Sequence, residues 1–268
     1  MINKLMSIYR KIAFDQKKQY DRIALGYMSE CDKILDVGCG EGRFVSNNPK
    51  KIKGIDGNEN SVKGCIKKGY DVTKANVTEI PYKDNSFDGV HCSHVIEHLN
   101  PEDAYELLSE LARVLRTGGI LVIRTPMLYD GFYDDFTHIK PYHPKAVLHY
   151  LKTSKQSIQT TLKPIGQFEV LKLKYRYAPL FLGIIDTPFK FIFPLFNLLY
   201  GLGISSLKKN GYMLILRKIE IDKDWWIQDD ERGIVIKWIC KKCGMPLEHI
   251  PKDGKCPNTN CSNNGGTI

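Results

Sequence analysis

The five residues from His94 to His98 read His-Val-Ile-Glu-His, which is the H-x-x-E-H pattern of an inverted zinc-protease helix. In such a helix, two imidazoles one turn apart bind zinc and the glutamate serves as a base. Here Pro101 starts a new helix three residues after His98, so the pattern is in the wrong frame for that chemistry. We therefore predict a loop, in which Ser93 and His94 line a site and Glu97 and His98 brace the backbone by hydrogen bonding; a catalytic role for Glu97 and His98 is the alternative.

A glycine-rich stretch is the second group of residues with a specific use. ILDVGCGEGRF at 34–44 reads as a strand that carries Asp36 at its end, a turn at 38–42 and then a helix. Glycines in the turn let a ligand approach the backbone, and the start of a helix offers free N–H groups. Eighteen residues after Gly38 the next predicted strand ends in Asp56, which is placed to accept hydrogen bonds from ribose hydroxyls.

The elements that must position these residues alternate between strands and helices. The clearest helix begins after Asn100, a natural N-cap, and Gly118 ends it; a short helix is expected at 144–152. Short β-branched runs flanked by Gly, Asp or Pro predict strands at 33–37, 51–56, 70–76, 87–92, 119–125, 167–175 and 211–220. The alternation predicts an α/β fold with a doubly wound, mostly parallel seven-stranded sheet, whose ligands bind outside the carboxyl ends of the strands.

Together these motifs resemble the class I S-adenosylmethionine (SAM) dependent methyltransferases. The glycines are spaced G-x-G-x-G, and an acid lies two residues before the first. NVTEIPYKDNSFDGV at 76–90 is similar to the family's D-a-x-x-l-P-f-x-d-x-s-F-D segment, and LARVLRTGGILVI at 111–123 to its helix, turn and fifth strand. A nicotinamide-binding protein would share the fold class but lacks this order of motifs. The resemblance covers about residues 30–126 and implies a Rossmann-like methyltransferase fold with SAM as cofactor.

The resemblance also implies which residues hold SAM. Asp36 and the glycine turn would hold the methionine and sulfonium end, and Asp56 the ribose. Asn76 would accept from the adenine amino group, where the family usually has Asp. The implied cofactor-binding residues are Asp36, Gly38, Cys39, Gly40, Asp56, Gly57, Asn76, Val77 and Ser93.

The type of acceptor is inferred from what this chain lacks near the expected methyl group. Methyltransferases that act on exocyclic or amide nitrogens often carry Asn/Asp-Pro-Pro-aromatic after the fourth strand, whereas this chain has CSHV at 92–95. Enzymes that methylate C5 of a pyrimidine need a nucleophilic Cys, often beside Pro, and Cys92 has no such neighbour. We therefore expect an oxygen acceptor on a small molecule, sugar or lipid head group, which requires removal of a proton.

The expected base is His138. The segment DFTH at 135–138 resembles a D-x-T-H loop in methyltransferases associated with glycan and polysaccharide synthesis. An imidazole titrates near neutrality, and Asp134 or Asp135 could orient it. The predicted catalytic residues are thus His138, Asp135 and His94; the alternative for His138 is a structural role at the next helix.

Four cysteines near the C-terminus predict a metal site. Cys240 and Cys243 form C-x2-C, and after twelve residues Cys256 and Cys261 form C-x4-C. Four thiolates in two close pairs can surround a structural Zn²⁺ ion, and the metal can fold a module too small to have its own core. In a chain without an export signal such pairs favour metal over disulfides, and reduced, metal-free thiols are the alternative.

Charge is concentrated in the second half of the chain. Residues 1–150 carry 21 Lys/Arg and 20 Asp/Glu, whereas residues 151–268 carry 18 and 10. This excess favours an anionic partner such as RNA, phosphate or a membrane surface, or a solvated lysine-rich face. The apolar but interrupted segment 178–204 predicts a helical lid or a peripheral element in a membrane interface, and is too broken to span. The N-terminus lacks a signal-peptide pattern, which predicts a cytoplasmic protein.

The sequence thus predicts four regions. They are an N-terminal helical segment at 1–32, the methyltransferase domain at 33–220 with the 178–204 insertion, a linker at 221–234 and a zinc-ribbon-like module at 235–268. The predicted function is transfer of a methyl group from SAM to an oxygen on a sugar, lipid-linked or small-molecule acceptor. The alternatives are an RNA methyltransferase that grips RNA with the basic half and the ribbon, and a non-catalytic SAM-sensing zinc-ribbon protein.

Overall fold

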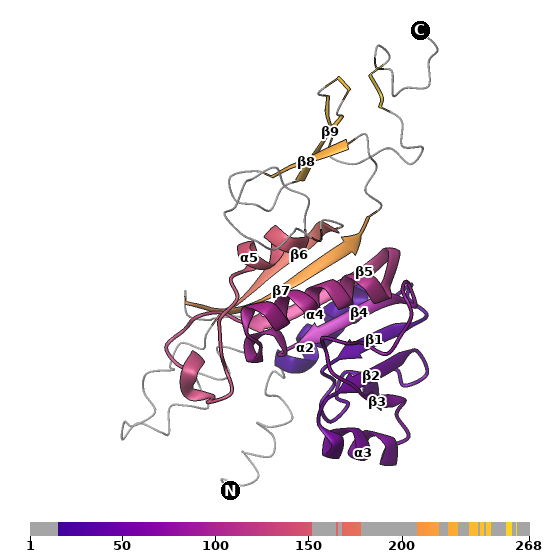
Figure 1. Cartoon of the computed structure of the whole chain (residues 1–268), viewed down its shortest axis with the longest axis vertical. Coiled ribbons are helices and arrows are strands. Elements are labelled where there is room, and N and C mark those ends of the chain that lie inside the picture. Colours follow the sequence, from indigo (N-terminus) through magenta and orange to yellow (C-terminus); the bar gives the residue numbers. More distant parts are fainter. Residues whose placement is uncertain are drawn as a thin grey trace, which may run out of the picture.

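Seven strands form one sheet in the order β3-β2-β1-β4-β5-β7-β6 (Figure 1). In the computed structural model the described residues are 16–151, 165, 168–177, 208–219, 225–229, 236–240, 242–243, 245–247, 256–258 and 261. The strands are β1 (Ile34–Val37), β2 (Ile52–Asp56), β3 (Val72–Lys74), β4 (Phe87–Ser93), β5 (Leu115–Pro126), β6 (Phe168–Tyr177) and β7 (Lys209–Lys218). β1 to β5 pair in parallel, and β7 runs antiparallel to both of its neighbours. The predicted doubly wound, mostly parallel seven-stranded sheet is confirmed.

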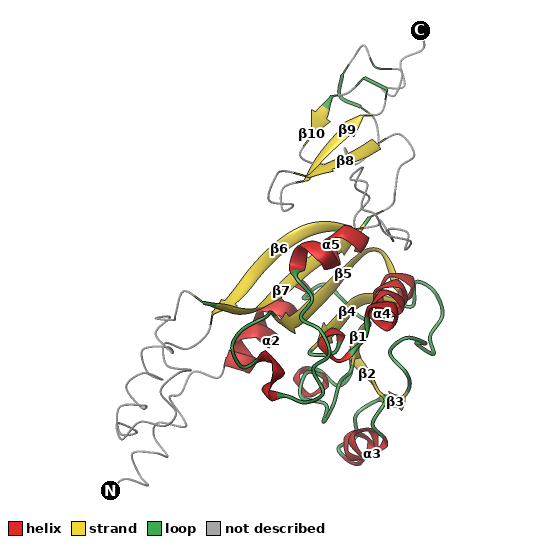
Figure 2. Cartoon of the chain, turned by 60° about the vertical axis from the view of Figure 1, so that its left-hand side comes forward, coloured by secondary structure: helices red, strands yellow, loops and turns green. Residues whose placement is uncertain are grey.

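Helices cover both faces of this sheet (Figure 2). They are α2 (Gln16–Tyr27), α3 (Glu59–Lys67), α4 (Pro101–Val114) and α5 (Pro144–Leu151), with 3₁₀ turns η1 (Val45–Asn47), η2 (Ile96–His98) and η3 (Phe132–Asp134). Successive residues of β5 point to opposite faces: Leu121 and Ile123 join the core under α4 and α5, while Ile120 and Val122 join the core under α2 and α3. Because side chains alternate along β5, this strand contributes to two apolar cores, one on each face of the sheet.

The helix α4 begins as its sequence predicts and ends earlier. Asn100 caps it by accepting a hydrogen bond from the Asp103 N–H at 2.8 Å, and Pro101 occupies the first turn. The last helical residue is Val114, and β5 begins at the next residue, well before the Gly118 stop that the sequence suggests. The buried ammonium of Lys218 donates to the carbonyl oxygens of Ala112 and Leu115 at 2.8 and 2.7 Å. This lysine therefore donates hydrogen bonds to carbonyl oxygens that the end of a helix leaves without intrahelical partners.

The prediction of a helix directly after the glycine turn is wrong. Only the 3₁₀ turn η1 lies between the turn and β2. The segment from 43 to 51 contains Asn47, Asn48 and Pro49, which favour turns over helix, and it is too short to leave the sheet and return as a helix. Free N–H groups at this site therefore belong to the turn itself.

A second, three-stranded sheet lies near the C-terminus. Its order is β10-β9-β8, formed by β8 (Trp225–Asp229), β9 (Ile236–Cys240) and β10 (Pro246–Leu247), all antiparallel. β8 lies inside the segment predicted to be a linker, because Trp225, Trp226 and Ile227 have the aromatic and β-branched side chains that favour strands.

No helix of the described residues is long and apolar enough to cross a membrane. The predicted lid or membrane-interface segment at 178–204 lies outside the described residues.

Replacing Lys218 by Met is expected to lower the free energy of unfolding by about 1–3 kcal/mol, because two buried carbonyl oxygens lose their donor. Urea unfolding monitored by circular dichroism measures this. The matched control is Lys172→Met on the neighbouring β6, where the side chain is exposed and the expected change is below about 0.5 kcal/mol. Equal stability of the two variants would contradict the capping role of Lys218.

Candidate functional site

The glycine turn after β1 adopts backbone conformations that other residues avoid. Gly38 and Gly40 have φ angles of 70° and 53°. A Cβ atom on Gly38 would lie 2.3 Å from Cγ2 of Val95, whereas a Cβ on Gly40 would meet no protein atom within 4 Å. The Asp56 carboxylate at the end of β2 fixes the turn by accepting hydrogen bonds from the N–H groups of Gly40 and Asn58, both at 2.8 Å. Gly38 therefore secures the fold, and Gly40 borders open space.

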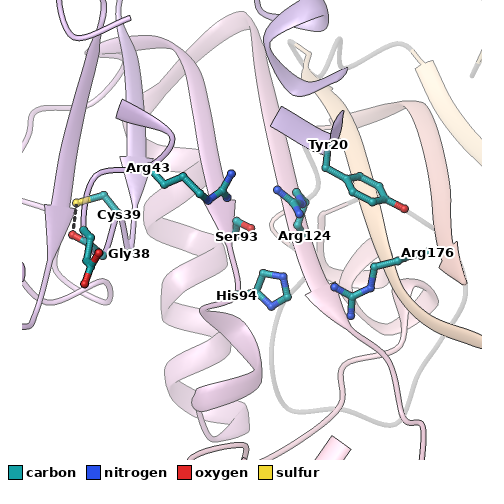
Figure 3. Close-up of a pocket in the computed structure, with 10 residues that line it drawn as sticks. Tyr20, Gly38, Cys39, Arg43, Ser93, His94, Arg124 and Arg176 are labelled. Carbon is teal, nitrogen blue, oxygen red and sulfur yellow. Dashed lines mark hydrogen bonds between the residues drawn. The ribbon is translucent and has the colours of Figure 1, made fainter. Parts of the chain in front are cut away.

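A cavity of about 460 Å³ opens beside this turn, at the carboxyl ends of β1, β4 and β5 (Figure 3). Five of its residues, Gly38, Cys39, Gly40, Ser93 and His94, are among those that the sequence predicts for the site. The others are Tyr20, Glu41, Arg43, Arg124 and Arg176. The structure therefore joins the glycine turn and the loop after β4 in one cavity.

The residues present fit a nucleoside cofactor such as SAM. Because Gly40 has no side chain, the space that a Cβ atom would fill is open to a ligand. Ser93, on the cavity wall, has a buried hydroxyl oxygen without a hydrogen-bond partner among the described residues, so it can serve a ligand. Asp56 and Gly57 end β2, and Asn76 and Val77 follow β3; they lie at the carboxyl edge of the sheet but outside the walls of this cavity. Asn76 Oδ1 accepts from the N–H of Thr78 at 3.2 Å.

Asp36 has a partner that the sequence did not suggest. Its carboxylate lies 2.7 Å from Nδ1 of His91, the residue beside it on β4, and both side chains are buried. The His91 ring stacks on Phe44 with 3.8 Å between centroids. Asp36 is absent from the cavity wall. In this structure its carboxylate therefore links β1 to β4 beneath the turn.

His94 is held in a strained position by a buried carboxylate. Its φ angle of 58° is rare for a residue other than glycine. Nδ1 of His94 lies 3.0 Å from Oε1 of Glu97, whose side chain is fully buried, and Oε2 of Glu97 accepts from Thr125 Oγ1 at 3.0 Å. The cavity wall withdraws part of the His94 ring from water, which lowers its pKa, and the hydrogen bond to Glu97 opposes this in part. The imidazole is therefore oriented toward the cavity and favours its neutral form.

The predicted base His138 lies elsewhere. Its Nδ1 is 2.6 Å from the carbonyl oxygen of Phe132, and its ring packs against Phe132 and His98. Asp135 lies 3.8 Å from Nε2 of His138, while Oδ1 of Asp135 accepts from Thr137. Neither His138 nor Asp135 lines the cavity.

The 94–98 segment has the loop structure that its sequence predicts. It forms a loop and the 3₁₀ turn η2 instead of an α-helix. His98 Nδ1 lies 3.1 Å from the Thr137 carbonyl oxygen, and the Glu97 carbonyl oxygen accepts from the Ile139 N–H at 2.8 Å. The expected bracing roles of Glu97 and His98 are confirmed by these contacts. Potential ligand atoms of Glu97, His98 and His138 lie within 4.8 Å of one another.

Sequence reasoning missed the basic wall of the cavity. Tyr20 comes from α2, Arg43 follows the turn, and Arg124 and Arg176 lie near the carboxyl ends of β5 and β6. Asp21 of α2 forms ion pairs with Arg43 and with Arg124. One signal was available: Arg124 interrupts the apolar run GILVI, and a charged side chain within a central strand is rarely buried without a specific use.

The four C-terminal cysteines lie together. The Sγ atoms of Cys240 and Cys261 are 3.5 Å apart, as are those of Cys243 and Cys256, and all four lie within 4.8 Å of one another. A tetrahedral zinc site with Zn–S bonds of about 2.3 Å places its sulfur atoms about 3.8 Å apart. Ile219, next to the end of β7, packs against this cluster. The four-cysteine cluster is compatible with a small zinc module.

Comparison with known proteins agrees with this geometry. Residues 35–123 match the family described as methyltransferase domain. The chain is 30% identical over 200 residues to an uncharacterised protein of Methanocaldococcus jannaschii, an alignment that covers 65% of this chain and 94% of that one. It is also 30% identical over 140 residues to a probable SAM-dependent methyltransferase of Mycolicibacterium smegmatis, covering 48% of this chain and 53% of that protein. The chain thus spans about half the length of this second relative.

Among solved structures, a SAM-dependent methyltransferase from Archaeoglobus fulgidus superposes with a TM-score of 0.54 at 29% identity. The superposition covers 75% of this chain and 92% of that one.

Replacing Gly40 by Ala is expected to weaken SAM binding about ten-fold or more, because the new methyl group enters the cavity without touching the protein. Gly69→Ala is the matched control: its φ is 79°, its Cβ also meets nothing, and it lies outside the cavity. Both variants are expected to lose about 1–2 kcal/mol of stability for a left-handed alanine. Calorimetric titration with SAM compares them, and equal affinities would remove Gly40 from the cofactor site.

Proposed function

Because this chain belongs to the SAM-dependent methyltransferases, we propose that it transfers the methyl group of SAM to an oxygen atom of a sugar, lipid-linked or small-molecule acceptor. The observation that carries the proposal is the His94–Glu97 pair on the cavity wall. A hydroxyl acceptor must lose a proton during methyl transfer, and this pair is built to take it.

The pair has the features of an oriented general base. With the Nδ1 proton donated to Glu97, the lone pair of His94 lies on Nε2, which has no partner among the described residues. Glu97 is itself held by Thr125, so the tautomer and the ring direction of His94 are both fixed. We place the base on His94 and not on His138, because only His94 lines the cavity.

His94 would remove the proton that an acceptor hydroxyl loses during methyl transfer. SAM supplies a methyl carbon activated by its sulfonium, and the electron pair of the broken C–S bond stays on sulfur. Nε2 of His94 accepts the hydroxyl proton while the acceptor oxygen forms its bond to the methyl carbon. The imidazolium then returns the proton to solvent, to which the side chain is 42% exposed. The chain's own contribution is alignment and proton removal.

The same site disfavours a cysteine nucleophile. Cys92 is buried, and burial together with the nearby carboxylate of Glu97 raises the pKa of its thiol well above the ordinary range. Attack on carbon requires a thiolate, which this environment suppresses. This supports an oxygen acceptor over the C5 position of a pyrimidine.

For the C-terminal module we propose a structural Zn²⁺ bound by Cys240, Cys243, Cys256 and Cys261. The closeness of the four Sγ atoms supports it. Structural zinc sites with four protein ligands have no open position for chemistry, so the metal would stabilise the fold of β8 to β10 and its surroundings.

The acceptor is tested by incubating the pure protein with radiolabelled SAM and an extract of its own host, followed by separation into lipid, glycan, RNA, protein and small-molecule fractions. Label in the lipid, glycan or small-molecule fraction supports the proposal. Label in RNA would indicate instead that the basic second half of the chain binds the substrate. Binding of SAM without label in any fraction would favour a sensor over an enzyme.

Replacing His94 by Asn is expected to lower the rate of methyl transfer about 10²- to 10⁴-fold with SAM affinity unchanged, since Asn tolerates φ near 58° but cannot act as a base. In the wild type the rate falls as pH drops through the lowered pKa of His94, below about 6.5, and is level above it. The variant loses this dependence. His138→Asn keeps it, and the reverse pattern would restore His138 as the base.

The zinc content distinguishes a zinc-bound C-terminal module from one with reduced, metal-free thiols. The full chain is expected to contain one equivalent of zinc, and Cys261→Ser to lose it, because the thiolate set would be incomplete. Cys31→Ser is the matched control, since Cys31 is a buried thiol of the main domain that donates to the Asp88 carbonyl, as a hydroxyl also can. Elemental analysis measures the metal. A zinc-free wild type, or a Cys261 variant that retains zinc, would contradict the site.

A further inference from the structure

Three guanidinium groups share the wall of the cavity that holds His94. They belong to Arg43, Arg124 and Arg176. One lining carboxylate, Glu41, is exposed, and Asp21 behind the wall pairs with both Arg43 and Arg124. Arg43 and Arg124 therefore share one carboxylate, and all three guanidinium groups are permanent positive charges.

Arg124 is buried and fixed in direction. It is 5% exposed, its Nη1 lies 3.2 Å from Asp21, and its guanidinium lies over the Tyr20 ring at 4.9 Å from the centroid. Burial lowers the pKa of Arg124 to about 10, and the positive charges of Arg43 and Arg176 contribute in the same direction. The Asp21 carboxylate opposes this shift in part, and a buried cation whose burial is not fully offset gains from an anionic ligand.

Arg176 is oriented by neutral groups alone. Its Nε donates to Asn210 Oδ1 at 2.9 Å, and its Nη2 donates to the Asn210 carbonyl oxygen at 3.1 Å. Gly211 leaves the room for this, because a Cβ there would lie 2.9 Å from Nη2. In the described part of the chain no carboxylate forms an ion pair with Arg176. Its charge is thus positioned and left without a counter-charge.

Arg124 and Arg176 occupy the side of the cavity opposite the glycine turn, and Arg43 lies between. Figure 3 shows Gly38 and Cys39 at one end, Ser93 and His94 in the middle, and Arg124 and Arg176 at the other end. A cofactor at the turn and an acceptor hydroxyl at His94 would therefore leave the rest of the acceptor beside Arg124 and Arg176.

We propose that Arg124 and Arg176 bind an anionic group, a phosphate or a carboxylate, on the methyl acceptor. Planar guanidinium groups match the oxygen atoms of either anion in a bidentate manner. The anion would fix the distance between itself and the reacting hydroxyl, and thereby select the hydroxyl that His94 deprotonates. The inference rests on the proposed function, because it assigns the rest of the cavity to the acceptor.

Binding of small anions tests the site without knowledge of the full acceptor. Inorganic phosphate and acetate are titrated by calorimetry into the full chain, first free and then saturated with S-adenosylhomocysteine, which fills the cofactor site and supplies its carboxylate. We expect binding of at least one anion, weakened about ten-fold in Arg176→Gln. Gly211→Ala, which displaces the same guanidinium but keeps its charge, is expected to weaken it too. Lys208→Gln, outside the cavity, is the control and should bind as the wild type does.

The outcomes separate the anionic site from the cofactor and from the proposed reaction. Anion binding that S-adenosylhomocysteine abolishes would assign the arginines to the cofactor carboxylate and overturn the proposal. No binding, or equal binding by Arg176→Gln, would overturn it as well. In the radiolabelling experiment, a labelled acceptor that an anion exchanger does not retain would overturn the anionic site while leaving methyl transfer intact. Failure to label any acceptor would count against methyl transfer alone.

Discussion

The buried carboxylate of Glu97 is the constraint on which the candidate site depends. A carboxylate removed from water must find donors, and this one takes them from the His94 ring and the Thr125 hydroxyl. Its backbone carbonyl in turn accepts from Ile139. One residue thereby ties the loop after β4 to the end of β5 and to the segment after η3. The strained backbone of His94 persists because these contacts determine its position.

The site combines elements that meet only at the carboxyl edge of the sheet. The turn after β1 and the loop after β4 meet because β1 and β4 are neighbours in the sheet. Arg176 reaches the same place from β6 because β7 pairs β6 with the rest of the sheet. The cavity therefore has one side built from the turn after β1, and another to which β5 contributes Arg124 and the edge strand β6 contributes Arg176.

The sequence allowed the sheet and the glycine turn to be predicted, because both depend on local patterns. Short β-branched runs, Asn100 before Pro101 and the spaced glycines each have one physical reason to occur where they do. The helix expected after the turn failed because the chain there is too short and too rich in turn residues. In the structure Asp36 contacts His91, and His138 contacts the carbonyl oxygen of Phe132. These contacts depend on the register of the strands and on the path of a loop, which local sequence patterns do not specify. Arg124 and Arg176 are 52 positions apart, and no local pattern links them.

The position of β7 has a consequence for how the chain acquires its shape. β7 lies between β5 and β6, although both precede it in the sequence. Until residues 209–218 have left the ribosome, β5 exposes an unpaired edge and β6 lacks the partner strand that joins it to the sheet. Contacts between strands so distant in sequence form slowly, because the closure entropy of the intervening chain is lost before they form. The nascent chain thus passes through a stage with two open strand edges, which is the stage at which aggregation competes with folding.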